Sequence, residues 1–177
     1  TGVERIRSLT DRPFLLNFFV QRTPAPSSEE IEHGAELLRP IWESLGWTAL
    51  PQPKQWCEDF DAQFETLLDL RPAAASFTFG ILDALQVERL HAAGILAIGT
   101  VTTVDEALAW QAIGADAVIA SGIEAGGHRG TFIGRQEDAT LTARELWPAV
   151  AQAVDIPVIA AGAIMDGSDI KAALTLG

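Results

Sequence analysis

The sequence contains little of several residue types, and each shortage excludes a class of protein. A single cysteine, Cys57, among 177 residues excludes a disulfide framework and a cysteine-rich metal site. Two lysines, Lys54 and Lys171, in a chain of net charge −12 argue against a nucleic-acid partner or an anionic membrane. No apolar run approaches the roughly 18 residues of a membrane span, and no secretory signal opens the chain. We therefore expect a soluble, cytoplasmic protein.

The rest of the composition is that of a folded domain. Apolar residues make up 48% of the chain and charged residues 20%, which argues against intrinsic disorder. No Pro/Gly-rich linker or low-complexity tract divides the sequence, so we expect a single domain over residues 1–177. The chain does not begin with methionine, and we expect a truncated start.

Apolar runs and helical periodicity alternate along the chain and predict parallel βα units. The run at 13–20 is continuous and apolar, so we expect a strand buried on both faces. Ser28 is expected to cap the helix that follows, and that helix is expected to be interrupted or ended near Pro40. Five such strands fit either an open doubly wound sheet or part of an eight-stranded barrel. The predicted strands are 13–20, 74–79, 95–99, 117–120 and 157–161, and the predicted helices are 29–45, 59–70, 84–93, 104–113, 142–154 and 168–176.

The segment 114–130 concentrates groups that can perform chemistry. A buried strand runs into a loop rich in glycine that holds Glu124, His128 and Arg129. In parallel α/β proteins the carboxyl ends of the strands carry the site, and a histidine there can act as a general base. The alternative is a glycine turn in which His128 only hydrogen-bonds the loop. Glu124 and Arg129 either line the site or form an ion pair that braces the loop.

Two other positions are candidates for ligand binding. The strand at 157–161 ends in Gly162 and Ala163 before a helix, where backbone amides favour a phosphate, although small residues also occur in such turns for packing alone. Asn17 is a polar residue within the apolar run at 13–20. Its amide either contacts the ring edge of a ligand or bridges to neighbouring backbone.

Four motifs together resemble one enzyme family. The stretch GADAVIASGIEAGGHRG at 114–130 resembles the signature of the nitronate monooxygenases, formerly called 2-nitropropane dioxygenases. RPFLLN at 12–17 resembles the family's third strand, TTVDEA at 102–107 the stretch after its fifth strand, and IPVIAAGAIMDG at 156–167 its seventh strand and phosphate turn. The resemblance implies a partial (β/α)8 barrel of about five parallel βα units, from the third strand through the seventh helix.

The same resemblance implies a flavin enzyme. Members use flavin mononucleotide (FMN), and with O2 they oxidise alkyl nitronates and nitroalkanes to carbonyl compounds and nitrite. His128 corresponds to the catalytic base near the flavin ring, and no metal is implied. Residues that correspond to positions at or near the flavin and its phosphate are Asn17, Asp116, Ser121, Gly122, Gly126, Gly127, Gly162 and Ala163.

The sequence also departs from the family pattern. The first two strands with their flavin loop and the eighth strand are absent, and Ala163 stands where glycine is usual. We therefore expect weak flavin binding and self-association through open barrel edges. One alternative is an FMN-dependent enoyl-[acyl-carrier-protein] reductase, which shares the barrel and a GGH loop, although the continuation at 129–132 favours the monooxygenase. Another is a non-catalytic phosphate-ligand-binding or assembly module.

Overall fold

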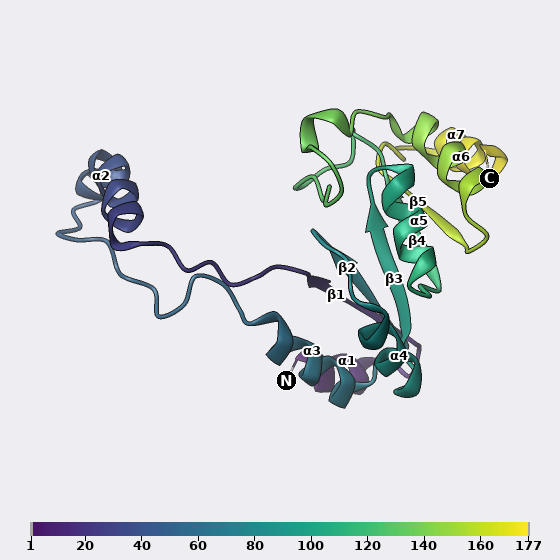
Figure 1. Ribbon diagram of the computed structural model, residues 1–177, viewed down its shortest axis with the longest axis horizontal. Coiled ribbons are helices and arrows are strands. Elements are labelled where there is room, and N and C mark those ends of the chain that lie inside the picture. The colour runs from purple at the N-terminus through teal and green to yellow at the C-terminus, as the bar shows by residue number, and fades with distance from the viewer. Residues whose placement is uncertain (1, 177) are drawn as a thin grey trace. The chain divides into compact units, whose positions relative to one another are not determined.

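The framework is one sheet of five parallel strands (Figure 1), and the computed structural model describes residues 2–176. The strand order is the sequence order, and each neighbouring pair is parallel. A doubly wound sheet reverses its strand order at a switch point, whereas a barrel adds each strand beside the last. The sheet is therefore part of a (β/α)8 barrel, and the predicted fold class is confirmed. Its strands are β1 (Leu15–Phe19), β2 (Ala74–Thr78), β3 (Leu96–Val101), β4 (Ala117–Ser121) and β5 (Val158–Ala161).

The helices follow the predicted order with small shifts at their ends. The sequence did not predict the first helix or a short 3-10 turn at Gln136–Asp138. None of the helices within residues 2–176 has the length and apolarity that crossing a membrane requires. The helices are α1 (Gly2–Leu9), α2 (Ser28–Ser44), α3 (Phe60–Leu70), α4 (Ala84–Ala92), α5 (Val104–Ala112), α6 (Ala143–Ala153) and α7 (Gly167–Leu176).

Helix α2 corrects two details of the sequence prediction. Its N-cap is Ser27, which forms a capping box with Glu30, so the cap and the helix start each lie one residue earlier than expected. The helix also continues through Pro40 to Ser44 instead of ending there. The turn after Pro40 is supported by Trp42, whose ring is buried and faces the guanidinium of Arg39.

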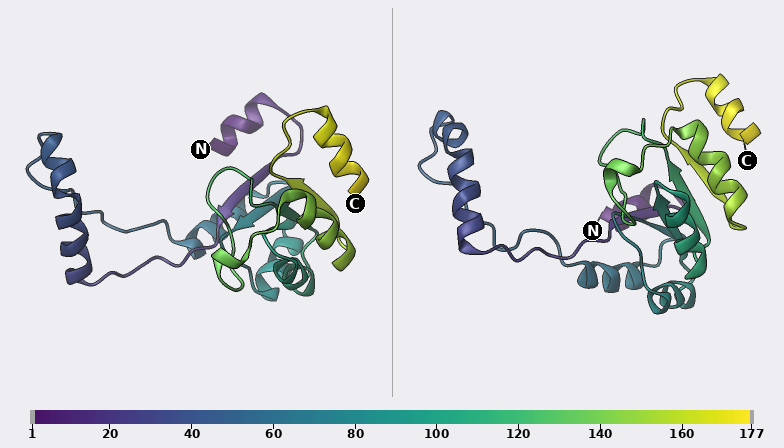
Figure 2. Two further views of the ribbon diagram at one scale, coloured as in Figure 1. Left: turned by 90° about the horizontal axis from the view of Figure 1, so that it is seen from above. Right: turned by 45° about the horizontal axis from the view of Figure 1, so that its top comes forward.

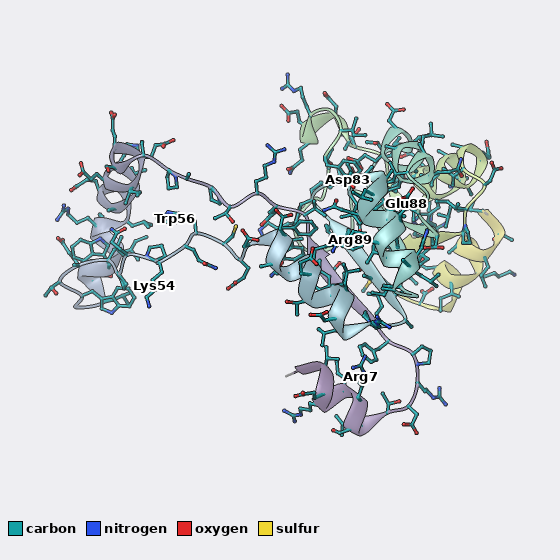
Figure 3. The ribbon with its side chains drawn as sticks, turned by 60° about the horizontal axis from the view of Figure 1, so that its bottom comes forward. Arg7, Lys54, Trp56, Asp83, Glu88 and Arg89 are labelled. Atoms are coloured by element: carbon teal, nitrogen blue, oxygen red, sulfur yellow. The ribbon has the colours of Figure 1, made fainter. Side chains whose placement is uncertain are left out.

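The chain divides into two compact units. Residues 22–63 form the smaller unit, in which the proline-rich loop at 50–56 and α2 line an apolar groove that includes Ile31, Leu38 and Trp56. The larger unit contains the whole sheet, α3 from Phe64 onward and the helices α1 and α4 to α7. Within it, the side chain of Arg89 on α4, which is labelled in Figure 3, forms an ion pair with Glu65 of α3 at 2.7 Å.

One face of the sheet is covered by helices. Figure 2 shows α4, α5 and α6 along this side, and their contacts are with β3, β4 and β5. Phe77, Gly99 and Val118 lie side by side in register on this face and point at the helices. Trp110 of α5 is fully buried there, and its ring stacks on Phe77 with centroids 6.0 Å apart. This layer is the hydrophobic core of the larger unit.

The opposite face, which is the inner face of the barrel, is largely open. Leu15 and Phe19 of β1 are 42% and 52% exposed, so the expectation of a strand buried on both faces is wrong. Leu96 and Ile159 on the same face are also about half exposed. Inner residues of a barrel are packed by residues from strands across the barrel, and the five strands described here cover this face only in part.

Replacing Gly99 should test the packing of the covered face. An added Cβ would lie 2.3 Å from the Trp110 ring, closer than any real contact, so Gly99→Ala forces the core to shift. We expect the free energy of unfolding to fall by about 1–3 kcal/mol, measured by chemical denaturation. Gly126→Ala is the control, because no atom lies within 4 Å of its added Cβ. Equal effects of the two substitutions would contradict this account.

Candidate functional site

The loop after β4 is held close to the carboxyl edge of the sheet by two glycines. A Cβ on Gly122 would lie 2.3 Å from the backbone nitrogen of Ala143, at the start of α6. A Cβ on Gly130 would lie 2.9 Å from the Thr78 side chain, at the end of β2. The two ends of the loop therefore pack at positions where only glycine fits. The residues between them lie beside the carboxyl ends of the strands.

His128 lies in this loop with its imidazole accessible. The side chain is exposed, and the preceding Gly127 has a left-handed backbone with φ of +85°. The ring meets Phe79 edge to face, with centroids 6.3 Å apart and planes at 84°. Within residues 2–176 neither ring nitrogen has a hydrogen-bond partner. The structure therefore lacks the loop hydrogen bond of the alternative interpretation and leaves both nitrogens available to a ligand.

Arg129 braces the loop through backbone carbonyls. Its guanidinium donates to the carbonyls of Ser121 at 2.6 Å, Gly122 at 2.8 Å and Ala139 at 2.8 Å. Burial lowers the pKa of Arg129, and the nearby carboxylates of Glu106 and Glu124 partly oppose that shift. Carbonyl oxygens, rather than the expected ion pair, are thus its direct partners in the described part of the chain.

Glu124 also has a structural contact. Its carboxylate accepts a hydrogen bond of 2.8 Å from the backbone N–H of Ala143, the first residue of α6. A negative charge at a helix start is favourable because it meets the unpaired amides and the positive end of the helix dipole. Both side chains therefore brace the loop, but among the described residues they do so through hydrogen bonds to backbone groups and not through the ion pair of that interpretation.

Glu106 is an organising residue that sequence reasoning missed. Its side chain is fully buried, and its carboxylate accepts four hydrogen bonds. Two come from the backbone N–H and hydroxyl of Thr102, at 2.6 and 2.9 Å, and two from the amides of Phe132 and Ile133, at 2.6 and 3.1 Å. The carboxylate thus ties the end of β3 to the chain just after the His128 loop. The sequence signal for this role was a glutamate in the first turn of α5, four residues after Thr102.

Asn17 lies on the inner face of the sheet and is exposed instead of buried. Its Oδ1 accepts hydrogen bonds from the hydroxyls of Ser76 at 2.9 Å and Thr78 at 3.4 Å. The Thr78 hydroxyl lies 3.2 Å from that of Thr100 on the next strand. Asn17 therefore bridges side chains across β1 and β2. Its Nδ2 group, without a partner in residues 2–176, remains a donor toward the inner side.

The turn after β5 offers free backbone amides. Gly162 has φ of +91°, and a Cβ there would lie 2.8 Å from the Cβ of Ala125, so the turn packs against the loop that holds His128. Ala163 is also left-handed, with φ of +53°, which is unfavourable for a residue with a side chain. This backbone explains why glycine suits the position. The Ala163 amide has no partner among the described residues, so it could bind an anion.

The backbone amides at the start of α7 already donate hydrogen bonds to carboxylates of the same segment, Asp166 and Asp169. Asp166 accepts from the backbone and hydroxyl of Ser168, and these hydrogen bonds lower the pKa of Asp166. Asp169 accepts from the amides of Met165 and Asp166, and the bond from Met165 lowers its pKa most. An anion at this end of β5 would therefore meet the amides of the turn, not the first amides of the helix.

Asp116 lies at the opposite end of β4 from the other candidate residues of segment 114–130. It directly precedes β4, so a strand of about 16 Å separates it from the loop after Ser121. Its carboxylate accepts from the amide of Ala97 at 2.7 Å and lies 2.9 Å from Nε2 of His91. The expected place beside a flavin is thus corrected: Asp116 joins β3, β4 and α4 at the amino edge of the sheet, where residues serve stability.

Glu106→Gln should loosen the loop that contains His128. A glutamine amide keeps the shape, but its nitrogen cannot accept, so buried amides among Thr102, Phe132 and Ile133 lose their partner. We expect the free energy of unfolding to fall by about 1–3 kcal/mol, with faster hydrogen exchange at Thr102 or at Phe132 and Ile133, whichever side the amide nitrogen faces. Glu88→Gln, on an exposed position of α4, is the control. Unchanged exchange at all three amides would refute the assignment.

Comparison with known proteins agrees with this architecture. The family model described as nitronate monooxygenase matches residues 1–177. A nitronate monooxygenase from Pseudomonas aeruginosa is 40% identical over 179 residues, covering 99% of this chain and 51% of the relative. A probable nitronate monooxygenase from Staphylococcus haemolyticus is 37% identical, with coverages of 99% and 50%. The chain thus spans about half the length of these relatives.

Solved structures give the same result. A nitroalkane oxidase from Streptomyces ansochromogenes superposes with a TM-score of 0.82 and 42% identity, covering 99% of this chain and 50% of that one. FabK from Thermotoga maritima superposes less well, with a TM-score of 0.64 and 26% identity over 99% of this chain and 42% of that one. The family model matches the whole sequence and these neighbours share the arrangement of its strands, so the chain belongs to the nitronate monooxygenase family.

Proposed function

We propose that the carboxyl edge of this sheet binds FMN and, with O2, converts alkyl nitronates and nitroalkanes to carbonyl compounds and nitrite. The observation that carries the proposal is His128, an exposed imidazole that has no hydrogen-bond partner among residues 2–176 and lies on a loop fixed at both ends. The names of the relatives support the substrate class.

The residues at this edge fit a flavin. The Nδ2 group of Asn17 is a donor suited to an acceptor atom of the ring. Gly126 and Gly127 have no atom within 4 Å of an added Cβ, so a flat ligand can approach their backbone. The turn amides at Gly162 and Ala163 suit a phosphate. Ser121 and Gly122 contribute indirectly, because their carbonyls hold Arg129.

The bound flavin would supply the electron acceptor for substrate oxidation, and the protein supplies orientation and a base. His128 takes the proton from the α-carbon of a neutral nitroalkane, for which the imidazole must be neutral and within hydrogen-bond reach of that proton. A pre-formed nitronate has already lost this proton. Oxidation of the nitronate therefore requires that the ligand be held, but not that a base act.

Flavin binding can be tested on the chain itself. FMN fluorescence titrated with the purified chain should be quenched, but with weak affinity, because the inner face of the described strands is partly open. Size-exclusion chromatography should show self-association through the exposed apolar residues of that face. Submicromolar binding by a monomer would contradict both expectations, and no quenching at any concentration would contradict FMN binding by this chain.

His128→Asn should affect turnover of neutral nitroalkane and of pre-formed nitronate differently. General-base catalysis contributes about 10²–10⁴-fold, so turnover of neutral nitroalkane by the FMN-loaded chain should fall by a factor in this range. Oxidation of pre-formed nitronate should be largely retained. Nitrite release measures both reactions, and His33→Asn, at an exposed position of α2, is the control.

Equal loss on both substrates would contradict proton abstraction by His128. The reductase alternative predicts a different result: rapid bleaching of the bound flavin by a nicotinamide donor, and none by nitronate. A flavin-loaded chain that releases no nitrite from either substrate would contradict the proposed activity of this chain.

A further inference from the structure

Phe79 has a backbone conformation that is unfavourable for its residue type. It directly follows β2, and its φ is +70°, in the left-handed region that bulky side chains avoid. The next residue, Gly80, packs so closely that a Cβ there would lie 2.9 Å from the side chain and carbonyl of Val20. The end of β2 is thus pressed against the end of β1, and the chain turns at Phe79.

Of the other two left-handed residues that carry side chains, Arg71 makes the contrast with Phe79 clear. Arg71, with φ of +45°, follows the last turn of α3, where a left-handed residue commonly ends a helix. Phe79 follows a strand, so no helix end accounts for its backbone. Such strain persists only where the surroundings determine the conformation, and it gathers at functional sites.

The Phe79 ring contacts two other rings. It meets Phe19 of β1 with centroids 4.9 Å apart and planes at 64°. It also meets the imidazole of His128, at 6.3 Å and 84°. Phe19 and His128 are both exposed, and Phe79 is half-buried, so this group of three rings is not part of the hydrophobic core. It lies at the carboxyl edge, beside the candidate site.

We propose that Phe79 is the positioning residue for His128, an inference that rests on the proposed function. Within residues 2–176, Phe79 is the described ring partner of His128, whose nitrogens make no hydrogen bond. An edge-to-face contact of this kind favours one orientation of the imidazole. It holds the ring while leaving both nitrogens available, which a hydrogen bond to the loop would not do. Phe79 itself packs against the ring of Phe19.

Nuclear magnetic resonance tests the contact without any enzymatic assay. The chain has three histidines, so His33 and His91 serve as internal references for the ring signals of His128. In Phe79→Leu the His128 ring signals should move toward those of a free histidine, because the neighbouring aromatic ring is lost. In Phe79→Tyr they should stay near their original positions. Arg71→Gly, which relieves left-handed strain elsewhere, should move none of them.

Kinetics then test the positioning role. With FMN bound, Phe79→Leu should lower kcat for neutral nitroalkane by about 10- to 100-fold, because a base displaced by about 1 Å loses that much rate. Turnover of pre-formed nitronate should change little, and Phe79→Tyr should restore nitroalkane turnover. If Phe79→Leu does not fold, Phe79→Gly removes the ring and the strain together and should give the same two results.

Two outcomes would overturn the proposal. Unchanged His128 signals in Phe79→Leu or Phe79→Gly would show that Phe79 does not hold the imidazole. Equal loss on nitroalkane and nitronate would show that Phe79 shapes the ligand site and does not act through His128. If the original chain itself releases no nitrite, the proposed function fails, while the histidine signals still decide whether Phe79 orients His128.

Discussion

The site depends on one buried carboxylate. Glu106 accepts hydrogen bonds from a backbone amide at the end of β3 and from amides just after the His128 loop, and Arg129 donates to backbone carbonyls at the start of that loop. Burying either charge is unfavourable unless hydrogen bonds replace its water, and here the protein backbone supplies those bonds. The two side chains therefore hold the loop in one conformation: Arg129 binds it near Gly122, and Glu106 binds it near Phe132. His128 lies between these two attachment points, so its side chain is exposed while its backbone is restrained.

The two edges of the sheet have different roles. At the amino edge, the carboxylate of Asp116 contacts the backbone amide of Ala97 and the imidazole of His91. These contacts link β3 and α4 to the start of β4 and involve no ligand. At the carboxyl edge, polar and aromatic groups have exposed surfaces or donors with no partner among residues 2–176, as in the amide of Asn17 and the ring of His128. This division is the usual one in (β/α)8 barrels, whose strand ends carry chemistry on one side and stability on the other.

Local features of the sequence were sufficient to predict most of the elements. Alternating apolar strands and amphipathic helices reflect periodicities that each element carries by itself, and the glycine-rich stretch around His128 marks a loop at a strand end. Contacts between distant segments were not predictable in this way. Glu106 bonds Phe132 across 26 positions, and no local pattern indicates such a partner. Pro40 was misjudged because a proline removes one helical bond locally, whereas capping and the packing of Trp42 act on the helix as a whole.

The sequence by itself determined the class of fold, the family resemblance and the position of His128 in a loop, because periodicity and motif are properties of neighbouring residues. The tertiary structure alone decided that the sheet adds its strands in order, that Asp116 lies at the far edge, and that the rings of Phe79 and His128 meet. These are relations between segments that are separated in the chain. They follow from packing in three dimensions, where a strained backbone or a buried charge is stable only because other parts of the fold hold it.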